Sequence, residues 1–242
     1  MYGGVPMRPR SLTSLAGRYE LESHQLGQLD AVLDELAQNE RAPTTVREPG
    51  RAVDVHIADS LVALEVDHLR SARRIADIGT GAGFPGLPLA VALPTSKMWL
   101  VESQSKKCQF LRRMIAAAGV DNVRVVEGRA EEWSEGLGAY DAVVARALAP
   151  VSVVLEYAAP LLELGGVLVD WRGRRDSARE AEAACAAEQL GMRRLEIRRT
   201  EPYEGARDHY LHVFEKVAET PSRFPRRAGV ARKRPLGPRA AK

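Results

Sequence analysis

The chain has 242 residues, of which 45% are hydrophobic and 28% charged, with a formal net charge of +3. Its length fits one α/β domain with short appendages, and no apolar run approaches the roughly 18 to 20 residues that a membrane span needs. The N-terminus carries no signal-like apolar segment, and the two cysteines, Cys108 and Cys185, lack metal-binding spacing. The sequence therefore predicts a reduced cytoplasmic protein with no membrane segment and no metal.

Basic residues concentrate at the two ends of the sequence. Residues 1–18 contain three arginines and no acid, and residues 221–242 contain eight Lys and Arg and no acid. Because the whole chain carries only +3, the segment between is acidic on balance. Basic ends on an acidic body favour contact of the ends with a polyanion, against the alternative of a tail kept for solubility. The tail has little to bury, so we expect it to be disordered or held at a few points.

Two helices are predicted before the first strand. Leucines at helical spacing predict a helix over 19–38, and the apolar positions of VDVHIADSLVALEV predict a second helix over 53–66. The segment RAPTTVREPGR between them is expected to be a loop.

Strands and helices then alternate. Strands are expected at 74–78, 98–101, 123–126, 140–144, 166–170, 194–200 and 209–216. Helices are expected at 87–92, 106–118, 151–162 and 176–190. This alternation predicts an α/β fold with a seven-stranded, mostly parallel sheet and helices on both faces. We divide the chain into an N-terminal helical extension (1–70), a catalytic domain (71–217) and a basic C-terminal tail (218–242).

A glycine-rich loop follows the first strand. Gly79, Gly81, Gly83 and Gly86 fall within eight residues, and glycines spaced in this way let the backbone approach a nucleotide-like ligand. A dinucleotide and S-adenosylmethionine both fit the pattern. Both also require an acid after the second strand to hold ribose hydroxyls, a role for Glu102.

Acidic residues around the loop favour the methyl donor. Asp77 precedes the glycines, where its charge would repel a pyrophosphate but attract the sulfonium and ammonium groups of S-adenosylmethionine. The stretch GRAEEW (128–133) adds Glu131 where an adenine edge would lie, although Glu131 alternatively belongs to the first turn of a helix. An acidic pocket therefore predicts S-adenosylmethionine as cofactor.

Six segments along the chain form a recognisable pattern. They are HIADSL (56–61), DIGTGAGFPGLPLA (77–90), LVESQSKKCQFL (100–111), GRAEEW (128–133), ARALAP (145–150) and FPRRAGVARKRPL (224–236). In their order and spacing the sequence resembles the RsmG (GidB) family of bacterial small-subunit ribosomal RNA methyltransferases, except at RAPTTVREPGR, where the family has an Asn-Leu-Thr stretch.

The resemblance implies a Rossmann-like class I fold and transfer of a methyl group from S-adenosylmethionine to N7 of one guanine in the decoding region of 16S rRNA. The small ribosomal subunit is thus the implied partner. Residues expected to bind the cofactor are Gly79, Gly81, Phe84, Glu102, Ala130, Glu131 and Arg146. Residues expected to bind RNA are Lys106, Arg129, Arg172, Arg226 and Arg227. We expect the tail to hold RNA without touching the methyl donor.

The residues present agree with attack by guanine N7, which carries no proton. No general base is then needed, and alignment and exclusion of water supply the rate. Arg146 follows the fourth strand and is expected to position the guanine or the methionine carboxylate; alternatively it pairs with Asp141 or Glu102 to fix a loop. His56 and Asp59 lie three apart on one helix face and are expected to bond each other or the loop above the site.

Two other functions fit parts of the pattern. A nicotinamide-dependent oxidoreductase predicts a Tyr-x-x-x-Lys motif or a substrate domain, and the sequence has neither. A non-catalytic RNA-binding assembly factor predicts a disrupted methyl-donor loop, yet the four glycines and Glu102 are intact.

Overall fold

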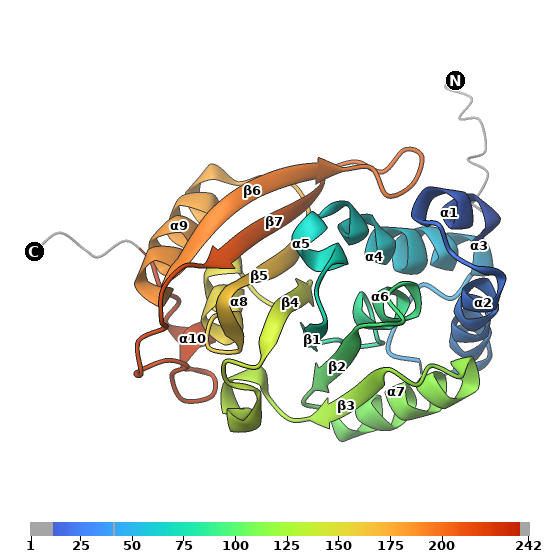
Figure 1. Cartoon of the computed structure of the whole chain (residues 1–242), viewed down its shortest axis with the longest axis horizontal. Helices are drawn as coiled ribbons and strands as arrows, with labels where there is room; N and C mark the ends of the chain where they lie inside the picture. The colour runs from blue at the N-terminus through green and yellow to red at the C-terminus, as the bar shows by residue number, and fades with distance from the viewer. Residues whose placement is uncertain (1–11, 41, 238–242) are drawn as a thin grey trace, which may run out of the picture.

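A computed structural model describes residues 12–40 and 42–237, and a seven-stranded sheet forms its centre (Figure 1). The strand order is β3-β2-β1-β4-β5-β7-β6. The strands are β1 (Arg74–Ile78), β2 (Lys97–Glu102), β3 (Val123–Glu127), β4 (Tyr140–Arg146), β5 (Leu162–Arg172), β6 (Met192–Thr200) and β7 (His209–Lys216). The first five are parallel, β7 pairs antiparallel with β5, and β6 pairs antiparallel with β7. The seven-stranded, mostly parallel sheet is confirmed.

Helices cover both faces of the sheet, as predicted. One face carries α1 (Leu12–Tyr19), α2 (Ser23–Gln38), α3 (Pro49–Ala52), α4 (Asp59–Leu61), α5 (Asp67–Arg70), α6 (Gly86–Ala92) and α7 (Ser105–Ala118). The other carries α8 (Val151–Ala158), α9 (Ser177–Leu190) and the short α10 (Val230–Lys233). Two hydrophobic cores result because successive residues of a strand point to opposite faces; Ile75 belongs to one core and Ala76 to the other.

The predicted helix over 19–38 is wrong at its start. Two helices are present, because the helical conformation is interrupted between Tyr19 and Ser23. Glu20 has a φ of 58°, which is outside the helical range, and Glu22 begins α2 with a capping box in which its backbone N–H donates to Gln25 Oε1 at 2.7 Å. The reciprocal cap fixes a new helix start that the leucine spacing does not reveal.

The predicted helices over 53–66 and 151–162 also need correction. The first is composite, because a π-helical segment (Val53–Ala58) precedes α4 and a 3₁₀ segment (Val62–Glu65) follows it. The second ends at Ala158, two residues before Pro160, whose ring cannot continue a helix. Strand β5 then begins at Leu162, four residues earlier than predicted.

Candidate methyl-donor and substrate site

The loop after β1 has the backbone conformation that its glycines allow. Gly79 and Gly81 have φ values of 69° and 62°, a region that other residues rarely adopt. A Cβ atom on Gly79 would lie 2.4 Å from Leu148 Cδ1, so the Leu148 side chain would have to move as well as the backbone being strained. The loop therefore brings bare backbone to the edge of the sheet.

Asp77 supports this loop from below. Its side chain is fully buried, and Oδ2 accepts hydrogen bonds from Thr80 Oγ1 at 2.6 Å and from the Gly86 N–H at 2.8 Å. Burial raises its pKa to about 6, against the opposing effect of these hydrogen bonds. The carboxylate that was expected to attract a cationic ligand is therefore turned under the loop, which it braces.

Glu102 lies at the end of β2, beside the loop. The residue is 5% exposed, and its carboxylate accepts hydrogen bonds from the Gly81 N–H at 3.2 Å and the Gln104 N–H at 2.9 Å. Lys107 Nζ is 3.8 Å from Oε2. Two backbone donors thus fix a carboxylate whose further lone pairs can accept from two hydroxyl groups.

A cavity of about 270 Å³ opens between the loop, the end of β2 and the segment after β3. Five of the residues predicted from sequence line it, namely Gly79, Glu102, Arg129, Ala130 and Glu131. Ala130 and Glu131 belong to a 3₁₀ turn (Ala130–Glu132), whose first N–H groups have no preceding helical turn to bond. The cavity thus combines a carboxylate for hydroxyls with polar groups for a base edge.

Further lining residues were not predicted. They are Val101, Ser103, Gln104, Lys107, Gly128, Ala147, Leu148, Tyr157 and Arg232. Ala147 has a φ of 53°, which turns the chain sharply after β4. Arg232 comes from the basic tail, which was expected not to touch the methyl donor, and its side chain lines this cavity. The sequence signal for this contribution of Arg232 is the segment FPRRAGVARKRPL (224–236), which resembles the family.

A second cavity of about 530 Å³ lies at the end of β4 and shares Ala147 with the first. Arg146 lines it, and Nη1 donates to Asp59 Oδ2 at 2.8 Å and to the Val55 carbonyl at 3.0 Å. Its guanidinium also lies 5.6 Å from the centre of the Phe84 ring. The expected alternative partners of Arg146, Asp141 and Glu102, are not its partners: Asp141 accepts from the backbone at the start of β1, and Glu102 belongs to the first cavity.

Asp59 also lines this cavity and has two partners, Arg146 and His209. Its second oxygen, Oδ1, is 3.1 Å from His209 Nδ1, and His209 lines the cavity as well. Of the two alternatives expected for His56 and Asp59, a bond between them is not formed. His56 Nε2 instead lies 3.1 Å from both Thr44 Oγ1 and the Val46 carbonyl oxygen. The His56 ring stacks on Phe84 at 4.4 Å, and burial, followed by Arg146, lowers its pKa to about 4.

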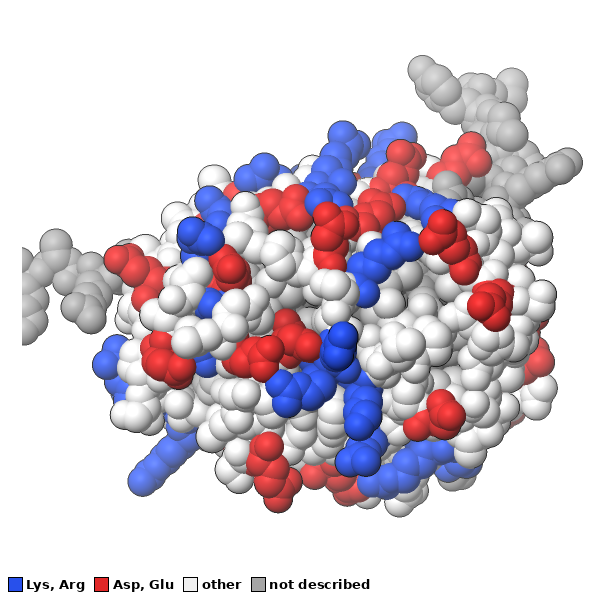
Figure 2. All heavy atoms as spheres, in the orientation of Figure 1, with Lys and Arg blue, Asp and Glu red and all other residues white. Residues whose placement is uncertain are grey.

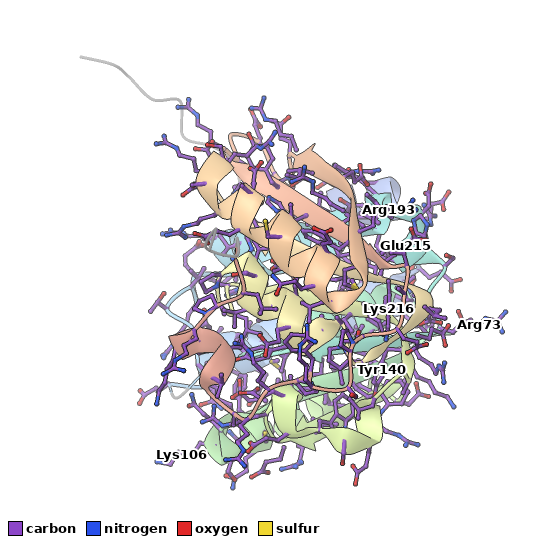
Figure 3. All side chains as sticks on the ribbon, turned by 90° about the vertical axis from the view of Figure 1, so that its left-hand side faces the viewer. Arg73, Lys106, Tyr140, Arg193, Glu215 and Lys216 are labelled. Carbon is purple, nitrogen blue, oxygen red and sulfur yellow. The ribbon has the colours of Figure 1, made fainter. Side chains whose placement is uncertain are left out.

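Phe84 is buried beneath the His56 ring and does not line the first cavity. Gly81 does not line it either, but its N–H donates to Glu102, which does. Arg172 lines the second cavity, with Nη2 2.5 Å from the buried Asp170. Arg226 binds Glu156 in place of a surface ligand, and Arg227 is exposed. Lys106 is exposed at the periphery of the molecule (Figure 3), and its neighbour Lys107 reaches the cavity instead.

Neither a metal cluster nor a membrane helix is found within 12–40 and 42–237. No group of three His, Cys, Asp or Glu side chains there has metal-binding geometry, and no helix is long and apolar enough to cross a membrane. The charged groups that remain are mixed in sign: Figure 2 shows acidic and basic side chains interspersed over one face, with a group of Lys and Arg along its centre.

The sheet order, with the antiparallel β7 between β5 and β6, the glycine loop after β1 and the acid that ends β2 define the class as a Rossmann-like class I methyltransferase fold. Cofactor-bound Rv0187 from MTB shares the fold, with a TM-score of 0.55 and 21% identity over 89% of this chain and all of that one. A SAM-dependent methyltransferase from Aquifex aeolicus has a TM-score of 0.53 and 18% identity, covering 69% and 96%. The model of the GidB family, rRNA small subunit methyltransferase G, matches residues 24–203, and the chain belongs to this family.

Relatives match along most of the chain. Ribosomal RNA small subunit methyltransferase G of Chloroflexus aggregans is 39% identical over 231 residues, covering 93% of this chain and 95% of the relative. The protein of the same name from Syntrophomonas wolfei is 41% identical, covering 76% and 86%. That of Synechococcus elongatus is 34% identical, covering 98% and 100%.

Proposed function

We propose that the protein transfers the methyl group of S-adenosylmethionine to N7 of a guanine in 16S ribosomal RNA, within the small subunit in the cytoplasm. The relatives named ribosomal RNA small subunit methyltransferase G support the rRNA substrate. The resemblance of the sequence motifs to the RsmG family supports the N7 position. The observation that carries the proposal is the meeting of two cavities of different character at Ala147.

The first cavity fits the methyl donor. Glu102 would hold the ribose hydroxyls, the bare backbone at Gly79 would allow close approach, and Ala130 with Glu131 would meet the adenine edge. When bound, S-adenosylmethionine supplies an electrophilic methyl group on a cationic sulfur. Lys107, Arg129 and Arg232 line the same cavity as Glu102 and Glu131, so the expected acidic pocket is wrong and charge does not separate the methyl donor from a dinucleotide. The family match supports the methyl donor.

The second cavity fits a nucleotide of the RNA. Its lining includes the arginines Arg146, Arg172, Arg174 and Arg207, which donate to phosphate oxygens and to guanine O6. Arg146 uses only Nη1 for its hydrogen bonds within the described residues, so the rest of its guanidinium is available to a ligand. Since Asp59 holds Nη1, the guanidinium is oriented before RNA arrives.

Attack by N7 requires no proton acceptor, and the carboxylates of this cavity agree with that. Both oxygens of Asp59 are engaged, one by Arg146 and the other by His209, and Asp208 lies 3.9 Å from Arg174. Neither is placed as an unpaired base. We therefore assign Arg146 the role of positioning the guanine, with the rate coming from alignment.

Borohydride reduction followed by aniline cleaves RNA at 7-methylguanine and so tests the proposal. 16S rRNA from a strain lacking the gene should lose one cleavage product. Expression of the wild-type protein should restore it, as should Cys185→Ala, which lies outside both cavities; Glu102→Ala should not. Purified protein with S-adenosylmethionine should create the same cleavage in 16S rRNA or small subunits from the deletion strain. An identical cleavage pattern with and without the gene would reject the N7 assignment.

A further inference from the structure

The basic tail folds back over the methyl-donor cavity. After β7 the chain returns along α8, and residues 224–234, which we call the tail arch, lie against that helix and the 3₁₀ turn at Ala130–Glu132. Phe224 is buried in the core formed by α8 and α9. The family match ends at residue 203, so the tail arch lies beyond it.

A buried ion pair holds the tail arch in place. Glu156 on α8 is fully buried and accepts hydrogen bonds from Arg226 Nε at 2.7 Å and Nη2 at 2.5 Å. The Arg226 N–H donates to the same carboxylate at 3.2 Å, and Nη2 also donates to the Arg234 carbonyl at 2.9 Å. Because a buried carboxylate without its cation is strongly unfavourable, this fork binds the tail to the domain.

The other end of the tail arch contacts the donor cavity itself. The Gly229 N–H is 3.4 Å from Glu131 Oε1, and Arg232 Nη2 donates to the Leu148 carbonyl at 3.1 Å. Burial raises the pKa of Tyr157, and the nearby Arg232 guanidinium opposes that shift. Glu131, Leu148, Tyr157 and Arg232 all line the cavity. The tail arch thus contacts the cavity lining at Glu131 and Leu148 and contributes Arg232 to the lining.

We propose that Arg232 is a residue of the methyl-donor site and that the Arg226–Glu156 pair positions it there. This inference rests on the proposed use of S-adenosylmethionine. The place of Arg232, beside Glu131 and Leu148, assigns it to the adenosine portion of the donor. A guanidinium there can pack on a purine face and donate to its ring nitrogens. The tail then contributes to donor affinity, separately from any attraction of its exposed cations to RNA.

Calorimetric titration of the full-length protein with S-adenosylmethionine and S-adenosylhomocysteine tests this proposal. Arg232→Ala should weaken both ligands roughly tenfold, the scale of one hydrogen bond from a charged donor. Lys233→Ala is the matched control, because it removes one positive charge from the same short helix without touching the cavity. It should leave both affinities within about twofold.

Arg226→Ala should also weaken donor binding, because it releases the arch that carries Arg232. Combining Arg226→Ala with Arg232→Ala should then add little to either change alone. Since Arg226→Ala leaves Glu156 buried without a partner, its melting temperature must be measured alongside. Arg232 is exposed, so Arg232→Ala should fold normally and remains a fair test even if Arg226→Ala does not fold.

The outcomes separate the two proposals. If wild-type protein binds neither ligand, the proposed cofactor is wrong. If wild-type protein binds the donor and folded Arg232→Ala binds it as tightly as Lys233→Ala does, the inference is overturned while the proposed function stands.

Discussion

Replacing Arg146 with lysine should affect stability and methyl transfer together. Nη1 of Arg146 bonds both Asp59 and the Val55 carbonyl, so it ties β4 to the N-terminal helices. Its guanidinium also lies over Phe84 and lines the second cavity. A lysine ammonium is a point charge without the planar fork, and it cannot keep all three contacts.

The structure sets the size of the stability loss. The side chains of Arg146 and Asp59 are 18% and 11% exposed, so the pair is largely shielded from water. Asp59 retains His209 as a partner, which limits the penalty for weakening the contact. Losing one hydrogen bond to a charged group, with the charge retained, should cost about 1 to 2 kcal/mol. For a chain of this size that lowers the melting temperature by about 3 to 6 °C.

The assay measures thermal unfolding and single-turnover methyl transfer at saturating RNA on one purified variant. The rate should fall roughly tenfold or more, the scale of a lost bidentate contact to a base. A double-mutant cycle with Asp59→Asn should show coupling in the melting data. A destabilised variant that turns over normally would limit Arg146 to bracing the fold, and an unchanged melting temperature would refute the reasoning from its contacts.

Three further outcomes are expected. Cys108→Ser and Cys185→Ala should keep methyl transfer within a few-fold, because N7 attack forms no adduct with a thiol; total loss in either folded variant would contradict the mechanism. Gly86→Ala should lower the free energy of unfolding by about 1 to 3 kcal/mol in urea titrations, since its Cβ would lie 2.4 Å from Leu100 Cδ2 and 2.7 Å from the buried carboxylate of Asp77. Burial raises the pKa of Asp170 to about 7, against the opposing effect of Arg172. The folded state therefore binds the Asp170 proton more tightly than the unfolded state does. The stability that this proton contributes at low pH is lost as the pH rises from about 4 to 7. Asp170→Asn should therefore gain stability relative to wild type as the pH rises through this window, and a pH-independent difference would show that Asp170 does not titrate there.

The sheet and the donor loop could be predicted from the sequence because their signals are local. Each buried parallel strand is a short apolar run, and the spacing of the glycines predicts a turn with positive φ values that other residues rarely adopt. Glu102 follows from the position of its strand. These signals depend on residues close together in the chain.

The contacts that could not be predicted join distant segments. Asp77 is an acid before a glycine loop, and the sequence does not show whether its carboxylate points to a ligand or under the loop. Arg146 finds Asp59, 87 residues away, and Arg232 reaches Leu148, 84 residues away. Composition predicted a tail that is disordered or held at a few points, and it could not name those points because nothing local reveals that Glu156 is buried and binds Arg226.

The position of β7 has a consequence for synthesis. The last strand in the chain is not at the edge of the sheet; it inserts between β5 and β6. Until the ribosome has released residues 209–216, β5 presents an unpaired edge rich in Val and Leu, which is a template for pairing with another chain. His209, which completes the Asp59–Arg146 contacts, arrives on the same strand. A nascent chain therefore closes its sheet and its substrate cavity in one late event, and chains interrupted before it are expected to aggregate.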